Sequence, residues 1–305
     1  MKIKYLFLVV ILATALSSGC KGRESHTTID PAKTEKSKGV EVGSSASALR
    51  IAVGGMITPK EGFAYYREFL DYIASKTGEP VHYVDAESYD EINKKLMKSE
   101  IDAGFVCSGP YVDGKKEFGL ELIAVPRAYG KTTYHSYIIV PKGSKATSME
   151  DLKGKRFAFT DPLSNTGKLV PEYMLKQKGE TPEKFFGKLS YSGSHDKSIS
   201  AVNQGLVDGA SVDSLIWDYA NRTKPEQTAN TVIIQKSEPY AIPPFVVRPG
   251  LPPDVKQKLS SILLNAHNDP KGKAILDKMM IDRFEKIEDS AYDTIREMKR
   301  LTDKP

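Results

Sequence analysis

The stretch Asp161-Pro162-Leu163-Ser164-Asn165-Thr166-Gly167 lies between two segments of different periodicity. Before it, residues 156–160 alternate in a way that favours a half-buried strand. After it, apolar residues recur at helical spacing from Leu169 to Leu175, and Gly179 supplies a typical helix stop. The stretch is therefore predicted to join a strand to the N-terminus of a helix.

Two interpretations of this junction are open. The first backbone N–H groups of a helix lack partners and the helix dipole is positive there, so such a junction can bind an anion. Ser164, Asn165 and Thr166 would place hydroxyl and amide groups beside that anion. The same residue types are also the preferred helix caps, and the stretch alone favours ordinary capping. The rest of the chain decides between the two.

Length and charge limit the class of protein. The chain has 305 residues, which is enough for two lobes of ordinary domain size. Its formal net charge is +5, and lysines are interspersed among acidic residues. Because no basic block of the kind found in nucleic-acid-binding arms occurs, nucleic acid is not expected as a partner.

Residues 1–20 have the pattern of a signal peptide, with Lys2 and Lys4, an apolar run over 5–16 and small residues before Cys20. The apolar run is short for a membrane span. A cysteine at this place resembles a bacterial lipoprotein cleavage site, where Cys20 would become the lipidated N-terminus. The leucine usual three places earlier is absent, so plain secretion stays open as an alternative. We expect a lipoprotein anchored in the membrane, in the periplasm or on the cell surface.

Residues 21–48 are rich in Ser, Gly, Lys, Glu and Thr and predict a flexible tether, because they offer little apolar surface to bury. The one other cysteine, Cys107, follows the apolar run 103–106 and is predicted to be a buried small hydrophobe. No Cys/His cluster has metal-binding spacing, and no glycine-rich nucleotide loop occurs. Neither a metal nor a cofactor is therefore expected.

From Leu49 onward, strand patterns alternate with helix patterns. Strands are predicted at residues 49–53, 81–84, 103–106, 120–127, 134–140, 156–160, 189–192, 207–212, 232–235 and 245–247. Helices are predicted at 59–77, 88–97, after 148, 169–178, 195–204, 215–221, 253–268, 270–280 and 290–301, and Ser108-Gly109-Pro110 is predicted as a turn. Repeated βαβ units imply an α/β fold with two mixed, mainly parallel sheets flanked by helices.

Breaks in this pattern near residues 130 and 240 indicate a chain that passes twice between two lobes. Ligands in such sheets bind outside the carboxyl ends of strands, so a cleft between the lobes is the expected site. The expected boundaries are 49–130 with 244–305 for lobe one, 134–238 for lobe two, and hinges near 131–133 and 239–243.

The chain resembles the periplasmic phosphonate-binding family of ABC importers. The resemblance rests on the lipoprotein start, the Asp161–Gly167 stretch with Pro171, Ser192-Gly193-Ser194-His195-Asp196, and the residues Ala201-Val202, Gly205 and Val207-Asp208-Gly209-Ala210. It covers the chain from Leu49 to the C-terminal helices. It implies a two-lobed type II periplasmic-binding fold that holds phosphonate, phosphite or phosphate, delivers it to an ABC permease as a monomer, and performs no reaction.

The resemblance also implies ligand contacts. The family's serine/threonine loop maps onto Ser164, Asn165 and Thr166, with Gly167 letting the backbone approach the ligand. Asn replaces the family's middle Thr, and Thr replaces its last Ser, so the family's ligand preference need not carry over. The family's site histidine maps onto His195, and an adjacent anion would favour its charged form.

Further candidates come from both lobes. The family's two site tyrosines map onto Tyr134 and Tyr89, and Ser108 lies on a segment expected to face the cleft. Family members that bind aminoalkylphosphonates use an acid at the second crossover, where this chain has Ile242-Pro243-Pro244. A second family acid aligns loosely near Asp213, which makes Asp213 a candidate contact. The missing first acid favours a small compact oxyanion over a ligand with an amine.

Two other functions, a hydrolase and a ligand-binding sensor, are alternatives to solute transport. Ser164, His195 and Asp213 would suit a hydrolase triad, but the chain has no Gly-x-Ser-x-Gly elbow. A ligand-binding sensor lipoprotein that docks on a membrane receptor is a second alternative, which the sequence does not separate from a transport protein. Arg127 and Lys168 are predicted to be solvated surface charges.

Overall fold

The computed structural model describes residues 48–54 and 59–303, and the side chains of 48–54 and 66–303. The predicted signal peptide, Cys20 and nearly all of the predicted tether lie outside the described residues. Within those ranges, no helix has both the length and the apolar character needed to cross a membrane.

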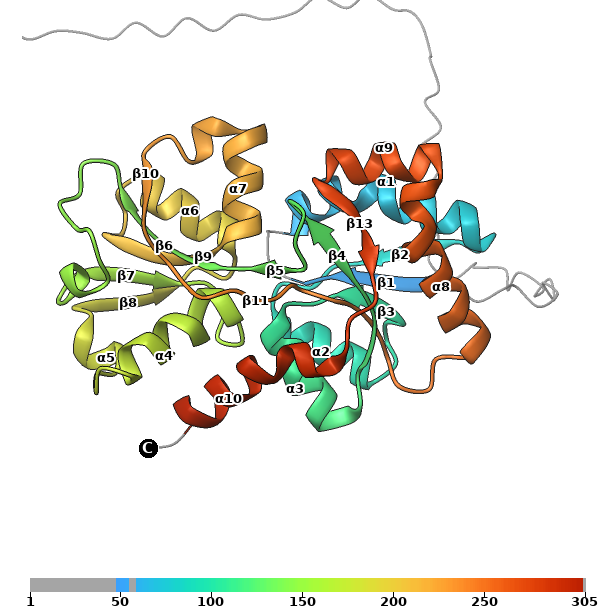
Figure 1. The fold of residues 1–305 in the computed structure, drawn as a ribbon, viewed down its shortest axis with the longest axis horizontal. Coiled ribbons are helices and arrows are strands. Elements are labelled where there is room, and N and C mark those ends of the chain that lie inside the picture. The colour runs from blue at the N-terminus through green and yellow to red at the C-terminus, as the bar shows by residue number, and fades with distance from the viewer. Residues whose placement is uncertain (1–47, 55–58, 304–305) are drawn as a thin grey trace, which may run out of the picture. The chain divides into compact units, whose positions relative to one another are not determined.

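The first lobe is built on a six-stranded sheet in the order β13-β4-β12-β3-β1-β2 (Figure 1). In it β1 is parallel to β2 and β3, whereas β12 is antiparallel to β3 and β4. The strands are β1 (Leu49–Val53), β2 (Val81–Val84), β3 (Ala103–Phe105), β4 (Glu121–Ala128), β12 (Phe245–Val247) and β13 (Ile281–Glu285). The helices are α1 (Pro59–Thr77), α2 (Tyr89–Met97), α3 (Ser108–Phe118), α8 (Pro253–Asn265), η4 (Ala266–Asn268), α9 (Pro270–Lys278), η5 (Asp289–Tyr292) and α10 (Asp293–Thr302).

The second lobe is built on a five-stranded sheet in the order β10-β6-β9-β7-β8. Here β7 is parallel to β8 and β9, and β6 is antiparallel to β9 and β10. The strands are β6 (Ser136–Pro141), β7 (Arg156–Phe159), β8 (Lys188–Tyr191), β9 (Gly209–Asp213) and β10 (Thr231–Lys236). The helices are η1 (Glu150–Leu152), η2 (Asn165–Leu169), α4 (Val170–Lys176), α5 (Pro182–Phe185), α6 (His195–Asn203), α7 (Ser214–Thr223) and η3 (Pro225–Gln227).

The two connections between the sheets lie side by side. Strand β5 (Thr133–Tyr134) leads from β4 to β6, and β11 (Tyr240–Ala241) leads from β10 back to β12. The two pair as an antiparallel ribbon with Tyr240 opposite Tyr134. Because both crossings share this ribbon, the carboxyl ends of strands in the two sheets are held near each other.

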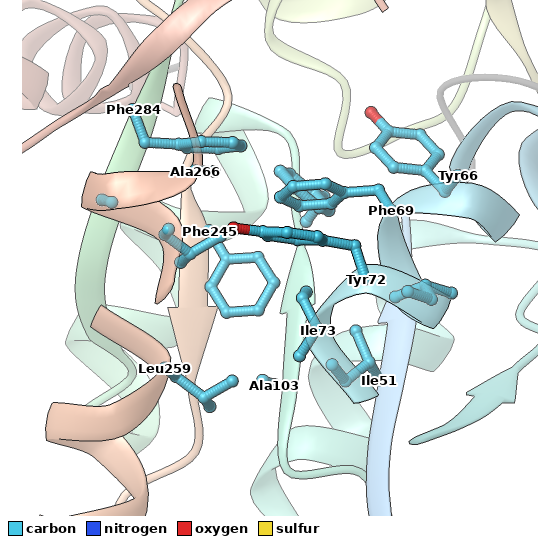
Figure 2. Close-up of a cluster of buried hydrophobic side chains, with 14 of the residues drawn as sticks. Ile51, Tyr66, Phe69, Tyr72, Ile73, Ala103, Phe245, Leu259, Ala266 and Phe284 are labelled. Atoms are coloured by element: carbon cyan, nitrogen blue, oxygen red, sulfur yellow. The ribbon is translucent and has the colours of Figure 1, made fainter. Parts of the chain in front are cut away.

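Apolar packing fixes the position of the first sheet. In β1, Ile51 faces the cluster formed with α1, α8 and α9, while Ala52 faces the cluster formed with α2, α3 and α10. Figure 2 shows the first cluster, in which Phe69 of α1 stacks on Phe284 of β13 with ring centroids 5.5 Å apart. Full burial of such a side chain contributes about 1.5–3 kcal/mol, so this aromatic cluster anchors the sheet independently of any ligand.

The predicted α/β pattern is largely present, with one wrong assignment. Ser108-Gly109-Pro110 opens helix α3 and is not an isolated turn. Proline is tolerated in the first turn of a helix, where its missing N–H is not needed. Strand β13 and helix α5 were not predicted, because both are short and lack a regular spacing of apolar residues.

The two lobes touch through the start of α3. A Cβ atom added at Gly109 would lie 2.6 Å from the Leu163 carbonyl oxygen and 3.3 Å from the Asn165 nitrogen. Close by, the backbone N–H of Tyr89 donates to Asp161 Oδ2 at 3.2 Å. Gly109 therefore allows a backbone approach that any larger residue prevents.

Replacing Gly109 with alanine is expected to separate the lobes, because the added methyl group meets backbone atoms that cannot turn away. Small-angle X-ray scattering should give a larger radius of gyration for Gly109→Ala than for the natural chain. Gly114→Ala is the matched control on the same helix, since its Cβ would meet only side-chain ends of Leu120 and Phe118. Superimposable scattering curves for the Gly109 variant and the natural chain would contradict this account.

Candidate functional site

Besides α1, which follows β1, five helical segments begin where parallel strands of the two sheets end. The carboxyl ends of parallel strands lie along one sheet edge, and ligands of α/β proteins bind there. The strand–helix pairs are β2–α2, β3–α3, β7–η2, β8–α6 and β9–α7, and their first helical residues are Tyr89, Ser108, Asn165, His195 and Ser214. The hydrogen bonds described below link these starts into one buried cluster.

The Asp161–Gly167 stretch has two roles. The Ser164 hydroxyl accepts the Gly167 N–H at 3.0 Å, which is ordinary capping. Asn165 Nδ2 donates to the Tyr134 hydroxyl at 3.1 Å, and its Oδ1 has no partner. The Thr166 hydroxyl also has no partner, although the residue is completely buried. One of the three candidate side chains therefore caps the helix, and the other two keep hydrogen-bonding capacity unused.

Gly167 is required for packing within the lobe, independently of its expected role beside a ligand. A Cβ atom at this position would overlap the Thr160 side chain, so close packing within the lobe explains the glycine. Thr160 also joins the two sequence motifs, since its N–H donates to the Gly167 carbonyl at 3.2 Å and its carbonyl accepts the Gly193 N–H at 2.8 Å. The Ser136 and Ser211 hydroxyls both donate to the Thr166 carbonyl, at 2.7 and 2.6 Å, and hold the loop in place.

His195 is a neutral hydrogen-bond donor in this structure. Its Nδ1 accepts the backbone N–H of Asp213 at 3.0 Å, which places the ring proton on Nε2. Burial lowers its pKa from 6.5 to about 3. The hydrogen bond at Nδ1 opposes the charged form, because a charged ring would point a second N–H at the Asp213 N–H. The expected effect of an adjacent anion on the charge of His195 stays a prediction. Nε2 lies 3.5 Å from Ser164 Oγ.

Asp213 caps α7 with one oxygen and leaves the other free. Oδ1 accepts the Leu215 N–H at 2.7 Å, whereas Oδ2 is buried and has no partner. Burial raises the pKa of this carboxyl to about 7, against the lowering effect of the backbone hydrogen bonds from Leu215 and Ile216. A buried carboxyl with a free oxygen can accept a proton or donate one near neutral pH.

The remaining candidates are buried as well. The Tyr89 hydroxyl has no partner, and burial raises the pKa of both Tyr89 and Tyr134. Cys107 is buried, as predicted, with its Sγ 3.8 Å from the Tyr134 hydroxyl. The Ser108 hydroxyl donates to the Ala241 carbonyl at 2.7 Å, so it joins α3 to β11 and offers only its lone pairs to a ligand.

Unpartnered polar atoms are concentrated at this place. A buried polar group without a hydrogen bond costs about 1–3 kcal/mol, so a cluster of them needs an explanation such as a missing ligand. Two of these atoms belong to Thr160 and Ser194, which the sequence analysis did not name as candidate contacts. For Ser194, its position as the N-cap of α6 was the signal that could have identified it. The set consists of Tyr89 OH, Thr160 Oγ1, Asn165 Oδ1, Thr166 Oγ1, Ser194 Oγ and Asp213 Oδ2.

The two cations named in the sequence analysis are paired with acids. Lys168 pairs with Glu172, and Arg127 pairs with Glu285 at 3.1 Å. The part of the chain that the structure describes also contains no group of three or more His, Cys, Asp or Glu side chains placed to hold a metal ion.

An apolar cavity of about 750 Å³ lies beside the cluster. Its walls come from α6 and α7 on one side and from β4, β13 and the second crossover on the other. Ile216, which lines it, also packs against Tyr89 and Cys107. None of the predicted contact residues is part of the described lining, so the polar cluster and the cavity are distinct features.

Ser164, His195 and Asp213 are close together without the geometry of a catalytic triad. In a triad the carboxylate accepts the Nδ1–H of histidine, and Nε2 takes the serine proton. Here Nδ1 accepts from the Asp213 backbone, and Nε2 already carries the ring proton. The histidine is therefore arranged to donate a hydrogen bond and not to act as the base.

Comparison with known proteins identifies the family. Residues 52–292 match the family described as ABC transporter, phosphonate, periplasmic substrate-binding protein. The chain belongs to this family. This confirms the family predicted from the sequence.

Individual relatives agree with this assignment. A probable ABC transporter phosphite-binding protein of Prochlorococcus marinus is 31% identical over 183 residues, which are 56% of this chain and 62% of that protein. The phosphonates-binding periplasmic protein of Escherichia coli is 26% identical over 75% of this chain and 69% of its own length. The aligned region thus spans about two thirds of these curated relatives.

Solved structures confirm the type II periplasmic-binding fold. A binding protein component of an ABC phosphonate transporter from Pseudomonas aeruginosa has a TM-score of 0.79 and 24% identity, covering 84% of this chain and 86% of that one. A Prochlorococcus marinus protein solved in complex with methylphosphonate has a TM-score of 0.77 and 23% identity, covering 85% and 99%.

We expect His195 to remain neutral well into the acid range. Long-range ¹H–¹⁵N spectra should show the Nε2–H tautomer and a pKa of about 3. Because the unfolded chain takes up this proton near pH 6.5, folding stability should fall from pH 6.5 toward 3, by up to about 1.4 kcal/mol per pH unit from this residue. Titration of His195 between pH 6 and 7 would show that the Asp213 N–H does not hold the ring as described.

Proposed function

We propose that this protein is an extracytoplasmic solute-binding protein that captures a small phosphorus oxyanion, namely phosphate, phosphite or a phosphonate, and delivers it to an ABC permease. The observation that carries the proposal is the set of buried polar atoms without partners at the ends of β2, β7, β8 and β9. Family membership supports the same conclusion.

The ligand's oxygens would replace the missing hydrogen-bond partners. Three hydrogen-bond donors are available to the ligand: the Thr166 hydroxyl, the Tyr89 hydroxyl and the Nε2–H of His195. Rotating the Asn165 amide by 180° would let Oδ1 accept the Tyr134 hydroxyl and turn the NH₂ group toward the anion. Charge-assisted hydrogen bonds contribute about 1.5–3 kcal/mol each. Several of them, less the cost of association, suit dissociation constants of roughly micromolar to nanomolar.

Binding would also hold the lobes together. Tyr89 and Ser108 belong to the first lobe, whereas the Ser164–Thr166 loop, His195 and Asp213 belong to the second. We place the lobes at 49–130 with 244–305 and at 134–238, with hinges near 131–133 and 239–243. The closed, ligand-loaded monomer would be the form that the permease recognises.

The alternatives carry less support. A hydrolase would need a histidine that accepts the Ser164 proton, and the hydrogen bond at Nδ1 opposes this. We therefore propose that the protein performs no catalysis. A sensor that docks on a membrane receptor would use the same binding chemistry, and the identity of the bound partner in the membrane would distinguish the two.

Replacing Thr166 with valine should weaken ligand binding without destabilising the fold, because it removes a buried hydroxyl that has no partner. Isothermal titration with phosphate, phosphite and methylphosphonate should show about a 10- to 150-fold loss of affinity for the oxyanion that binds the natural chain, which corresponds to about 1.5–3 kcal/mol.

The matched control is Thr228→Val. This threonine is also buried in the second lobe, but its hydroxyl donates to Asn221 Oδ1 at 2.8 Å. The control should lower the unfolding temperature and leave the affinity unchanged. Equal effects of the two variants on affinity would place the binding site elsewhere.

We further propose that Cys20 is lipidated and holds the mature protein at the membrane. Expressed in a bacterium with lipoprotein processing, the full chain should partition into the detergent phase of Triton X-114, and Cys20→Ser should move to the aqueous phase. Aqueous partitioning of the natural chain would favour plain secretion.

A further inference from the structure

Among the unpartnered atoms in the site, Asp213 Oδ2 differs in kind from the hydroxyls. An ionised carboxylate only accepts hydrogen bonds, as does a fully deprotonated ligand. Asp213 is completely buried, and the bond from the Leu215 N–H to Oδ1 fixes its orientation. A phosphorus oxyanion bound beside Oδ2 would therefore bring two negative groups into contact in a water-excluded place.

Among the described residues, no cation contacts Asp213 Oδ2, which has no hydrogen-bond partner. Lys236, Arg222 and His135 act on the neighbouring Asp218, where they oppose the rise in pKa that burial causes. His195 is neutral, because its Nδ1 accepts the Asp213 N–H. Asp218 of α7 adds a further negative charge, and burial together with Asp218 raises the pKa of Asp213. The other titratable groups that interact with this carboxyl are neutral thiol or phenol groups: Tyr66, Tyr89, Cys107, Tyr129, Tyr134 and Tyr137.

Two like charges in contact without a cation cannot both stay ionised, so one of them takes a proton. We propose that Asp213 makes ligand binding proton-coupled: the complex holds one proton between Asp213 Oδ2 and a ligand oxygen. The same complex forms when a hydrogen phosphonate donates its P–OH to the carboxylate and when a phosphonate dianion accepts from protonated Asp213. This inference rests on the proposed function.

The shared proton defines the ligand class. Oxyanions with an ionisable P–OH group, such as hydrogen phosphonate, hydrogen phosphite or hydrogen phosphate, bring the proton with them. Sulfate carries no proton near neutral pH, so its binding requires Asp213 to take one from solution. At alkaline pH a phosphonate or phosphite has lost this proton and must take one from solution, so its affinity falls, whereas hydrogen phosphate still carries its own.

The test is titration calorimetry of the full chain with methylphosphonate and with sulfate between pH 6 and 9, in buffers of different ionisation enthalpy. At pH 9 the natural chain should take up close to one proton for each methylphosphonate bound, and its affinity should fall about tenfold per pH unit above pH 8. Sulfate affinity should begin to fall at lower pH, as Asp213 ionises.

Asp213→Asn removes the proton site and keeps the helix cap, because asparagine is also a preferred N-cap. Its amide donates to the anion, so binding should lose the proton uptake and the fall with pH. Selectivity should shift at least tenfold from methylphosphonate toward sulfate at pH 8. Asp218→Asn is the control: this acid accepts the Tyr137 hydroxyl at 3.3 Å outside the site and should leave proton uptake unchanged.

Proton uptake that persists in Asp213→Asn, or its absence in the natural chain at pH 9, would overturn the inference while leaving oxyanion binding intact. Failure of the natural chain to bind methylphosphonate, phosphite or phosphate at any pH would overturn the proposed function, and this inference with it.

Discussion

The constraint on which this structure depends is the satisfaction of buried polar groups. In each sheet the parallel strands end at one edge, and helices begin there. The hydrogen-bonding groups at these helix starts are buried and need partners within the protein. Within the protein most of these groups find partners, as Ser164 does with the Gly167 N–H and Ser108 with the Ala241 carbonyl. The polar atoms that remain without a hydrogen-bond partner at this edge belong to a few side chains from both lobes. The aromatic core around Phe69 and Phe284 supplies stability that can offset their cost.

The Asp161–Gly167 stretch is also supported by the C-terminal helix. The C-terminal helix α10 packs against α3 and also against η2 and α4. Leu169 and Val170, which lie shortly after this stretch, share a buried cluster with Ile295 and Met298 of α10. The last helix of the chain therefore contacts both the first lobe and the loop-bearing helix of the second. Movement between the lobes has to be accommodated at this contact and at the β5–β11 ribbon.

Local pattern was sufficient to predict most of the fold. The strand before Asp161 and the helix after Gly167 follow from periodicity, and the capping role of Ser164 follows from its residue type. The assignment at Ser108 was wrong because glycine and proline are typical of turns but are also tolerated in the first helical turn, so local sequence does not discriminate. The short edge strand β13 was missed because an edge position needs no regular apolar pattern.

The sequence indicated the types of the candidate site residues. It did not indicate their protonation states or which of their polar atoms already have partners. Which groups stay free depends on partners distant in sequence: Ser108 is occupied by a carbonyl 133 residues away, and His195 is held neutral by the N–H of Asp213. Gly167 is necessary because Thr160 packs against it, a contact invisible in the local motif. Sequence therefore indicates which donors are available, and tertiary contacts decide which of them are used.

Neutral donors together with one buried acid have a physical consequence for selectivity. A lysine or arginine would attract any anion, and long side chains adapt to several shapes. Short hydroxyls, an imidazole N–H and a capped carboxyl have fixed directions, so a ligand of the wrong shape or protonation leaves buried groups unpaired. Lys168 of η2 and Arg127 of β4 are held by Glu172 and Glu285. For the proposed oxyanion, this arrangement would discriminate through hydrogen-bond geometry, and the position of a single proton would be part of that geometry.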